Sequence, residues 1–206
     1  MGKSSGQSKK IVFILIIAGI IAVLYINESH IRKYLDAMTS QAPRENLEKA
    51  QAALENHDIK ASIDAIDLAI ESLGFVEEYT DSISRSYIEK AIAEMRNLEV
   101  EIQKDELVFE DYKHAYFEAY SSMAYANLRL SELEFQDGSK ERAYEHFNNT
   151  FAYLKSALKY VADPKLEKEQ ALINEVNEIL EAMKAHEDLA SFDFNNMNNE
   201  MEDLMK

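Results

Sequence analysis

Glycine and proline are so scarce in this chain that they restrict its fold class more than any other feature. The 206 residues include five glycines and two prolines, and neither residue occurs between positions 75 and 137. β-Hairpins and β-sandwiches need these residues at their turns, whereas helices run for many residues without them. The sequence therefore predicts an all-α fold.

An apolar run lies near the N-terminus. Residues 11–26 read IVFILIIAGIIAVLYI, carry no charge, and follow Lys9 and Lys10. Sixteen helical residues extend about 24 Å, slightly less than the hydrocarbon core of a bilayer. A cleaved signal peptide is the alternative, but the small residues that cleavage requires do not follow the run closely. We expect residues 11–26 to be an uncleaved transmembrane signal-anchor behind a short basic tail at 1–10.

The charges on either side of this run predict its orientation. Three lysines precede it, whereas Arg32 and Lys33 behind it are offset by Glu28 and Asp36. Positively charged flanks stay in the cytoplasm. The sequence thus predicts a single-pass protein of the inner (cytoplasmic) membrane, with a cytoplasmic N-terminus and a periplasmic, extracytoplasmic C-terminal domain.

The chain is strongly acidic and lacks cysteine. Its 38 acidic and 22 basic residues give a net charge of −16. Such a surface repels the phosphates of nucleic acids, so we expect no nucleic-acid binding. A basic protein partner or divalent cations would complement it, although solubility alone accounts for it. Without cysteine there are no disulfides and no thiolate metal sites.

Helical spacing of apolar residues continues from residue 43 to 190 and predicts an acidic all-helical domain, preceded by a juxtamembrane helix or stalk at 27–42. Within it, Asp58 is expected to cap a helix that ends at Gly74. Between there and Gly138 the sequence allows one long helix or two that break near residues 104–106, and a compact domain favours the break.

The following segments begin with similar signals. Gly138 and Ser139 are expected to end one helix and cap the next, and Asp163 is expected to cap the last helix, with Pro164 in its first turn. When the sequence is shifted by 82 residues against itself, the predicted helices of its first half overlay those of its second half. This similarity is compatible with two three-helix repeats, at 43–104 and 107–190, as an alternative to one undivided domain.

Two segments resemble tetratricopeptide hairpins. In NLRLSELEFQDGSKERAYEHF, the first helix ends at a Gly and the second begins at an Ala followed four residues later by an aromatic, and the positions involved are Leu128, Leu130, Gly138, Ala143 and Phe147. The segment AQAALENHDIKASIDAIDLAI is similar, with Ala61 in the corresponding place. The resemblance implies a protein-binding module without chemistry. We expect about six helices behind the transmembrane helix, in a helical-hairpin bundle or a short TPR-like solenoid.

Residue patterns that indicate catalysis are lacking in the sequence. It has no G-x-S-x-G motif and no phosphate-binding glycine loop. Glu110, Asp111 and His114 form a weak metal-binding half-site without a matching second motif. The remaining histidines, including His146, are expected at the surface. We predict neither an enzyme nor a cofactor.

Two groups of residues are candidates for binding a partner. Tyr112, Tyr116 and Tyr120 belong to an aromatic run that either packs on both sides of its helix or forms an exposed groove. The acidic, Asn- and Met-rich tail at 191–206 is either a frayed end or an amphipathic helix that docks into a partner's groove, and its candidate contact residues are Phe192, Phe194, Met197, Met201 and Leu204.

These observations favour a membrane-anchored extracytoplasmic scaffold or accessory subunit that binds a protein partner within a membrane-associated complex. One alternative is a helical-bundle sensor or small-ligand-binding protein with an aromatic pocket. A metal-binding helical bundle is the third.

Overall fold

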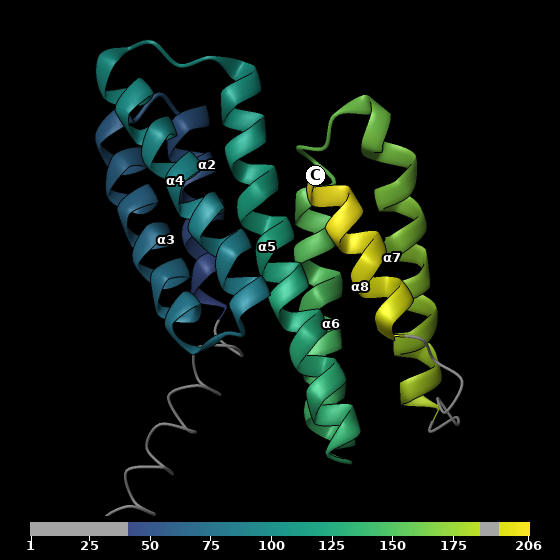
Figure 1. The fold of residues 1–206 in the computed structure, drawn as a ribbon. Coiled ribbons are helices and arrows are strands. Elements are labelled where there is room, and N and C mark those ends of the chain that lie inside the picture. The colour runs from purple at the N-terminus through teal and green to yellow at the C-terminus, as the bar shows by residue number, and fades with distance from the viewer. Residues whose placement is uncertain (1–40, 186–193) are drawn as a thin grey trace, which may run out of the picture. The chain divides into compact units, whose positions relative to one another are not determined.

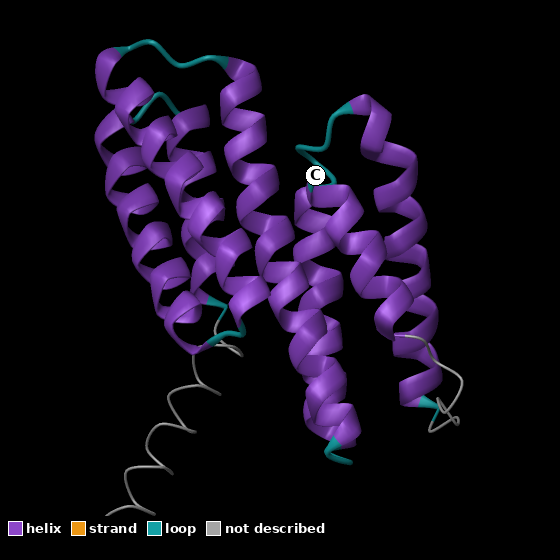
Figure 2. Ribbon diagram, viewed as in Figure 1, coloured by secondary structure: helices purple, strands orange, loops and turns teal. Residues whose placement is uncertain are grey.

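The computed structural model describes residues 41–185 and 194–206 (Figure 1). Within these ranges the chain consists of seven α-helices and turns, without a strand (Figure 2). This confirms the predicted all-α class. The basic tail at 1–10, the predicted anchor at 11–26 and nearly all of the predicted stalk lie outside the described residues.

Seven helices of 12 to 28 residues follow one another along the chain. They are α2 (Ala42–Glu55), α3 (Ile59–Tyr79), α4 (Ser82–Lys104), α5 (Phe109–Gln136), α6 (Lys140–Ala157), α7 (Asp163–Lys184) and α8 (Phe194–Met205). Each helix packs against the next, and α8 also returns to pack against α5 (Figure 1). All seven belong to one compact unit.

Helix α5 lies at the centre of this arrangement. It packs against α4, α6 and α8, and from Ala115 to Glu132 every side chain except that of Arg129 is buried. A helix that is covered all round needs small residues where its neighbours approach most closely. These positions are filled by Ala115, Ala119, Ala124 and Ala126.

Local side-chain and backbone chemistry sets several helix ends where the sequence predicted them. The Asp58 carboxylate accepts a hydrogen bond from the Ala61 amide at 3.0 Å and caps α3. Asp105 ends α4 in the left-handed region, with φ of 58°, which confirms the break near residues 104–106. Gly138, with φ of +77°, follows α5, as predicted, in a conformation that favours glycine.

Three predicted details differ from the structure. The prediction that a helix ends at Gly74 was wrong: α3 continues to Tyr79, because Val76 continues its buried stripe past the glycine. Ser139 occupies the N-cap position of α6, but its side chain makes no capping bond. Helix α7 begins at Asp163 itself, with Ala162 at the N-cap position.

None of the described helices is both long enough and apolar enough to cross a membrane. The segment for which we predict a membrane span, residues 11–26, lies outside the described part of the chain.

Close packing around α5 makes its alanines intolerant of larger side chains. We expect Ala126→Leu to lower the free energy of unfolding by about 1–3 kcal/mol, because Ala126 is fully buried. Urea denaturation measures the change. Leu133→Ala, at a side chain on the same helix that is 47% exposed, is the control and should change stability by about 0.5 kcal/mol or less. Equal effects of the two substitutions would contradict this account of α5.

Candidate functional site

The C-terminal helix α8 packs its apolar face against the rest of its own domain. Its buried side chains are Phe194, Met197, Met201, Leu204 and Met205. The Phe194 ring lies 5.7 Å from that of Phe135 on α5 and 6.0 Å from that of Phe147 on α6. Four of the five predicted partner-binding residues of the tail are therefore in the core of this chain. The fifth, Phe192, lies outside the described residues.

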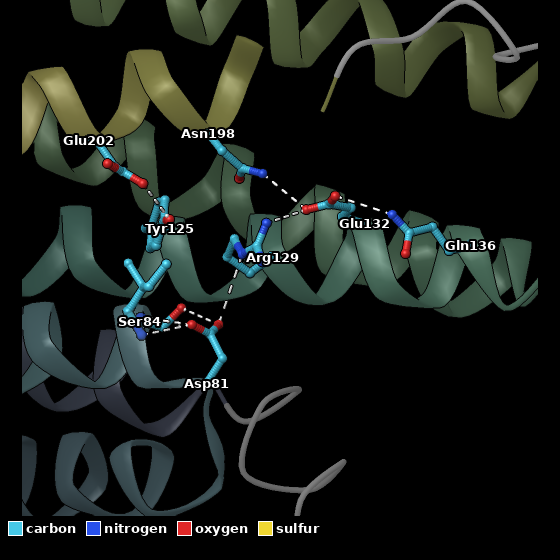
Figure 3. A network of polar contacts seen from close by, with 9 residues as sticks. Asp81, Ser84, Tyr125, Arg129, Glu132, Gln136, Asn198 and Glu202 are labelled. Atoms are coloured by element: carbon cyan, nitrogen blue, oxygen red, sulfur yellow. Dashed lines mark hydrogen bonds and ion pairs between the residues drawn. The ribbon is translucent and has the colours of Figure 1, made fainter. Parts of the chain in front are cut away.

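A polar network joins α8 to α5 (Figure 3). The Tyr125 hydroxyl donates a hydrogen bond to the Glu202 carboxylate at 3.0 Å, and the Asn198 amide donates one to the Glu132 carboxylate at 3.0 Å. Glu132 also accepts hydrogen bonds from Arg129 and from Gln136. Because Glu132 and Asn198 are buried, these bonds fix the position of α8 along α5.

Arg129 extends this network to the turn between α3 and α4 (Figure 3). Its guanidinium pairs with Glu132 and also lies 4.0 Å from the carboxylate of Asp81. Asp81 in turn caps α4 by accepting hydrogen bonds from the amides of Ile83 and Ser84, at 2.9 and 3.1 Å. One arginine thus connects the start of α4 with the helix at the C-terminus.

Helix α7 packs against α8 and also carries a buried carboxyl group. Lys165 of α7 donates a hydrogen bond to the Leu204 carbonyl at 2.6 Å and lies over the Phe117 ring. One turn farther along α7, Glu169 is fully buried, and neither carboxyl oxygen has a hydrogen-bond partner. Burial raises the pKa of Glu169 to about 8, against the opposing effect of the Lys165 charge.

Five tyrosines form a contiguous cluster between α5 and α6. Tyr160 is at its centre, with ring centroids 5.8, 5.1 and 5.8 Å from those of Tyr112, Tyr116 and Tyr120. Tyr153 joins through a contact of 6.4 Å with Tyr120. The predicted aromatic residues of α5 are thus brought together, but Tyr116 and Tyr120 are buried and Tyr112 is only half-buried.

The tyrosine cluster also involves the first described helix. The Tyr160 hydroxyl donates a hydrogen bond to the Gln51 side chain of α2, and Gln41 donates one to Asn149 of α6 at 2.9 Å. The Tyr116 hydroxyl is buried without a hydrogen bond. Burial raises the pKa of Tyr116 well above its ordinary value, so the phenol remains neutral.

The weak metal candidates do not form a metal centre in the described part of the chain. Glu110 and Asp111 are exposed in the first turn of α5, and Glu110 lies 3.8 Å from Lys113. His114 is 3.9 Å from Glu118, which is buried and pairs with Lys90 at 2.8 Å. Among the described residues, no three acidic or histidine side chains could hold one metal ion.

The prediction of a surface position for His146 was wrong. The side chain is buried beside Asn127, with 3.4 Å between its Nδ1 and the amide oxygen. Burial, assisted by the charge of Arg142, lowers the pKa of His146 to about 4, so the imidazole is neutral at pH 7. Glu145 beside it is exposed, but the packing of α6 against α5 covers His146.

An exposed apolar segment spans the start of α5, and it was not among the candidates predicted from the sequence. Leu107, Val108 and Phe109 are 42%, 51% and 64% exposed. The signal was available, since three consecutive apolar residues follow Asp105 and Glu106 where a polar helix cap is usual.

Comparison with family models, curated proteins and solved structures found no match to this chain. The candidate site is therefore defined by the geometry of its own residues.

The raised pKa of Glu169 predicts how the free energy of unfolding depends on pH. The unfolded carboxyl ionises near pH 4.5 and the folded one near pH 8, so the folded chain holds a proton that the unfolded chain releases between these values. This contribution to stability is complete below pH 4.5 and is lost as the pH rises to 8. We expect Glu169→Gln to raise the free energy of unfolding by about 3 kcal/mol at pH 7 and by much less at pH 4.5.

Urea denaturation of both proteins across this pH range measures the effect. Glu167→Gln, at an exposed position on the same helix, is the matched control and should follow the wild-type curve. A difference between Glu169→Gln and the wild type that does not vary with pH would show that Glu169 is already ionised in the folded protein.

Proposed function

We propose that this protein is a membrane-anchored extracytoplasmic scaffold or accessory subunit that binds a protein partner within a membrane-associated complex. The observation that carries the proposal is the uncharged run at residues 11–26 with lysines before it, directly ahead of a helical domain. Such an arrangement holds the domain next to the membrane, where its surface meets other membrane-associated proteins.

The resemblance to tetratricopeptide hairpins supports the binding role. The two segments that carry it coincide with the α2–α3 and α5–α6 hairpins of the fold. Proteins built from such hairpins use them as binding surfaces. The finer proposal for the fold is therefore a helical-hairpin bundle or short solenoid that recognises protein.

Partner binding must use residues that the domain does not bury itself. Tyr116 and Tyr120, and the tail residues from Phe194 to Leu204 that we predicted as contacts, pack inside the domain. Tyr112 is half-buried and lies beside the exposed apolar turn before α5. The accessible candidates therefore lie at the start of α5.

Single cysteines test the anchor and its orientation, because the natural chain contains no cysteine and gives no background labelling. We expect a membrane-impermeant maleimide to label Glu89→Cys, an exposed position on α4, in intact spheroplasts. Ser4→Cys should react only after the membrane is dissolved, because residue 4 precedes the predicted span.

The wild-type chain is the control for non-specific labelling. Labelling of Ser4→Cys but not Glu89→Cys in intact spheroplasts would show that the N-terminus is outside, opposite to the predicted orientation. Recovery of the unlabelled chain in the soluble fraction would exclude the anchor.

A second candidate function is the binding of a small aromatic ligand at the tyrosine cluster. The buried Tyr116 hydroxyl without a hydrogen bond favours it, because such a group is costly unless a partner satisfies it. The chain has no tryptophan, so its intrinsic fluorescence reports on tyrosine. A ligand bound there should change this fluorescence in the wild type and bind more weakly to Tyr116→Phe. Identical titrations of the two proteins would exclude the cluster as the site.

A further inference from the structure

Three consecutive large apolar side chains are exposed at the connection between α4 and α5 and at the first residue of α5. We define the α4–α5 tip as Leu107, Val108 and Phe109, which are consecutive and exposed. Single exposed apolar residues are common on soluble domains, but adjacent large ones form a patch that water solvates poorly. Phe109 is the most exposed of the large apolar residues in the described part of the chain.

Local structure at the tip departs from what stability alone favours. Val108 occupies the N-cap position of α5, and no side chain caps the helix there. Ser, Thr, Asp and Asn are strongly preferred at this position, and Val is among the poorest choices. Asp58 and Asp81 cap the two preceding helices with hydrogen bonds, whereas α6 and α7, like α5, begin without a capping side chain. Residues that break a local rule without a structural gain are expected at functional sites.

Contacts with its neighbours hold Phe109 in place although it is exposed. Its ring stacks against that of Tyr112, with centroids 6.3 Å apart and an interplanar angle of 21°. The ammonium group of Lys113 lies 4.7 Å from the centroid of the same ring. A side chain that is already ordered loses less conformational entropy when a partner covers it.

The charges around the tip indicate the chemistry of such a partner. Four exposed carboxylates flank it in sequence, those of Asp105, Glu106, Glu110 and Asp111. Two lysines flank the same segment, and Lys113 lies 3.8 Å from Glu110. The excess of negative charge repels anionic lipid headgroups and attracts a surface rich in Lys and Arg.

We propose that the α4–α5 tip inserts into an apolar socket on a partner protein, and that basic residues of the partner surround the socket and pair with the carboxylates beside the tip. This inference rests on the proposed protein-binding function and names the surface that performs it. It does not depend on the predicted anchor.

A photoreactive phenylalanine analogue at position 109 tests the inference in the full-length chain in native membranes. The analogue at position 133 is the matched control, because Leu133 lies on the same helix and is 47% exposed. We expect crosslinks to one protein from position 109 and not from position 133. Mass spectrometry should place the crosslink in a segment that combines apolar residues with Lys or Arg.

Substitutions at the tip separate binding from folding. Val108→Ser supplies the missing N-cap, so its melting temperature should equal or exceed that of the wild type while the yield of the partner falls. Phe109→Ala should reduce the yield about tenfold or more, as expected for an aromatic residue at the centre of an interface. Leu133→Ala should leave the yield unchanged. Glu106→Lys combined with Asp111→Lys should reduce the yield and weaken its dependence on salt.

Several results would overturn the inference. They are a lack of crosslinked protein from position 109, equal crosslinking from positions 109 and 133, a crosslinked segment that is acidic, or an unchanged yield with Phe109→Ala. Crosslinking to lipid alone would also overturn it. These outcomes are distinct from failure of the anchor, which the cysteine-labelling experiment decides without reference to the tip.

Discussion

Burial of α5 on all sides is the constraint on which the rest of the domain depends. Because this helix touches α4, α6 and α8, it has no solvent-facing side from Ala115 to Glu132 apart from Arg129. Its sequence therefore combines alanines, where neighbouring helices come close, with tyrosines and leucines that fill the wider spaces. An ordinary surface helix needs one apolar stripe, but α5 must match several partners at once.

The packing around α5 buries polar groups of α5, α6 and α7, and each of them needs a partner or must remain uncharged. Glu132 obtains three, from Arg129, Gln136 and Asn198. His146 is kept neutral by burial. Glu169 obtains none and avoids the cost of a buried charge by remaining protonated. The interior thus contains one well-connected polar network that fixes helix positions and one isolated acid that makes stability sensitive to pH.

Features set by local chemistry could be predicted from the sequence, and features set by contacts between distant helices could not. Asp58, Asp105 and Gly138 act within their own turns, so their positions were read correctly. On α3, by contrast, Ala65 and Ala69 are buried while Ile59 and Leu68 are exposed. Which side of α3 is buried thus depends on the space between it and its neighbours, and not on the size of its apolar side chains. The tyrosine cluster also depends on contacts between residues 33 to 109 positions apart, so the sequence indicated its members on α5 but neither Tyr160 nor Gln51.

The docking of α8 has a consequence for how the chain is made. Synthesis proceeds from the N-terminus, so the segment that covers Phe135 and Phe147 leaves the ribosome after α5 and α6. Until then α5 has its other neighbours but lacks the one that contributes Asn198 and Glu202 to the polar network. A prematurely terminated chain would therefore expose apolar surface that chaperones and proteases recognise. A chain that stops before α8 therefore lacks one of the three neighbours that cover α5.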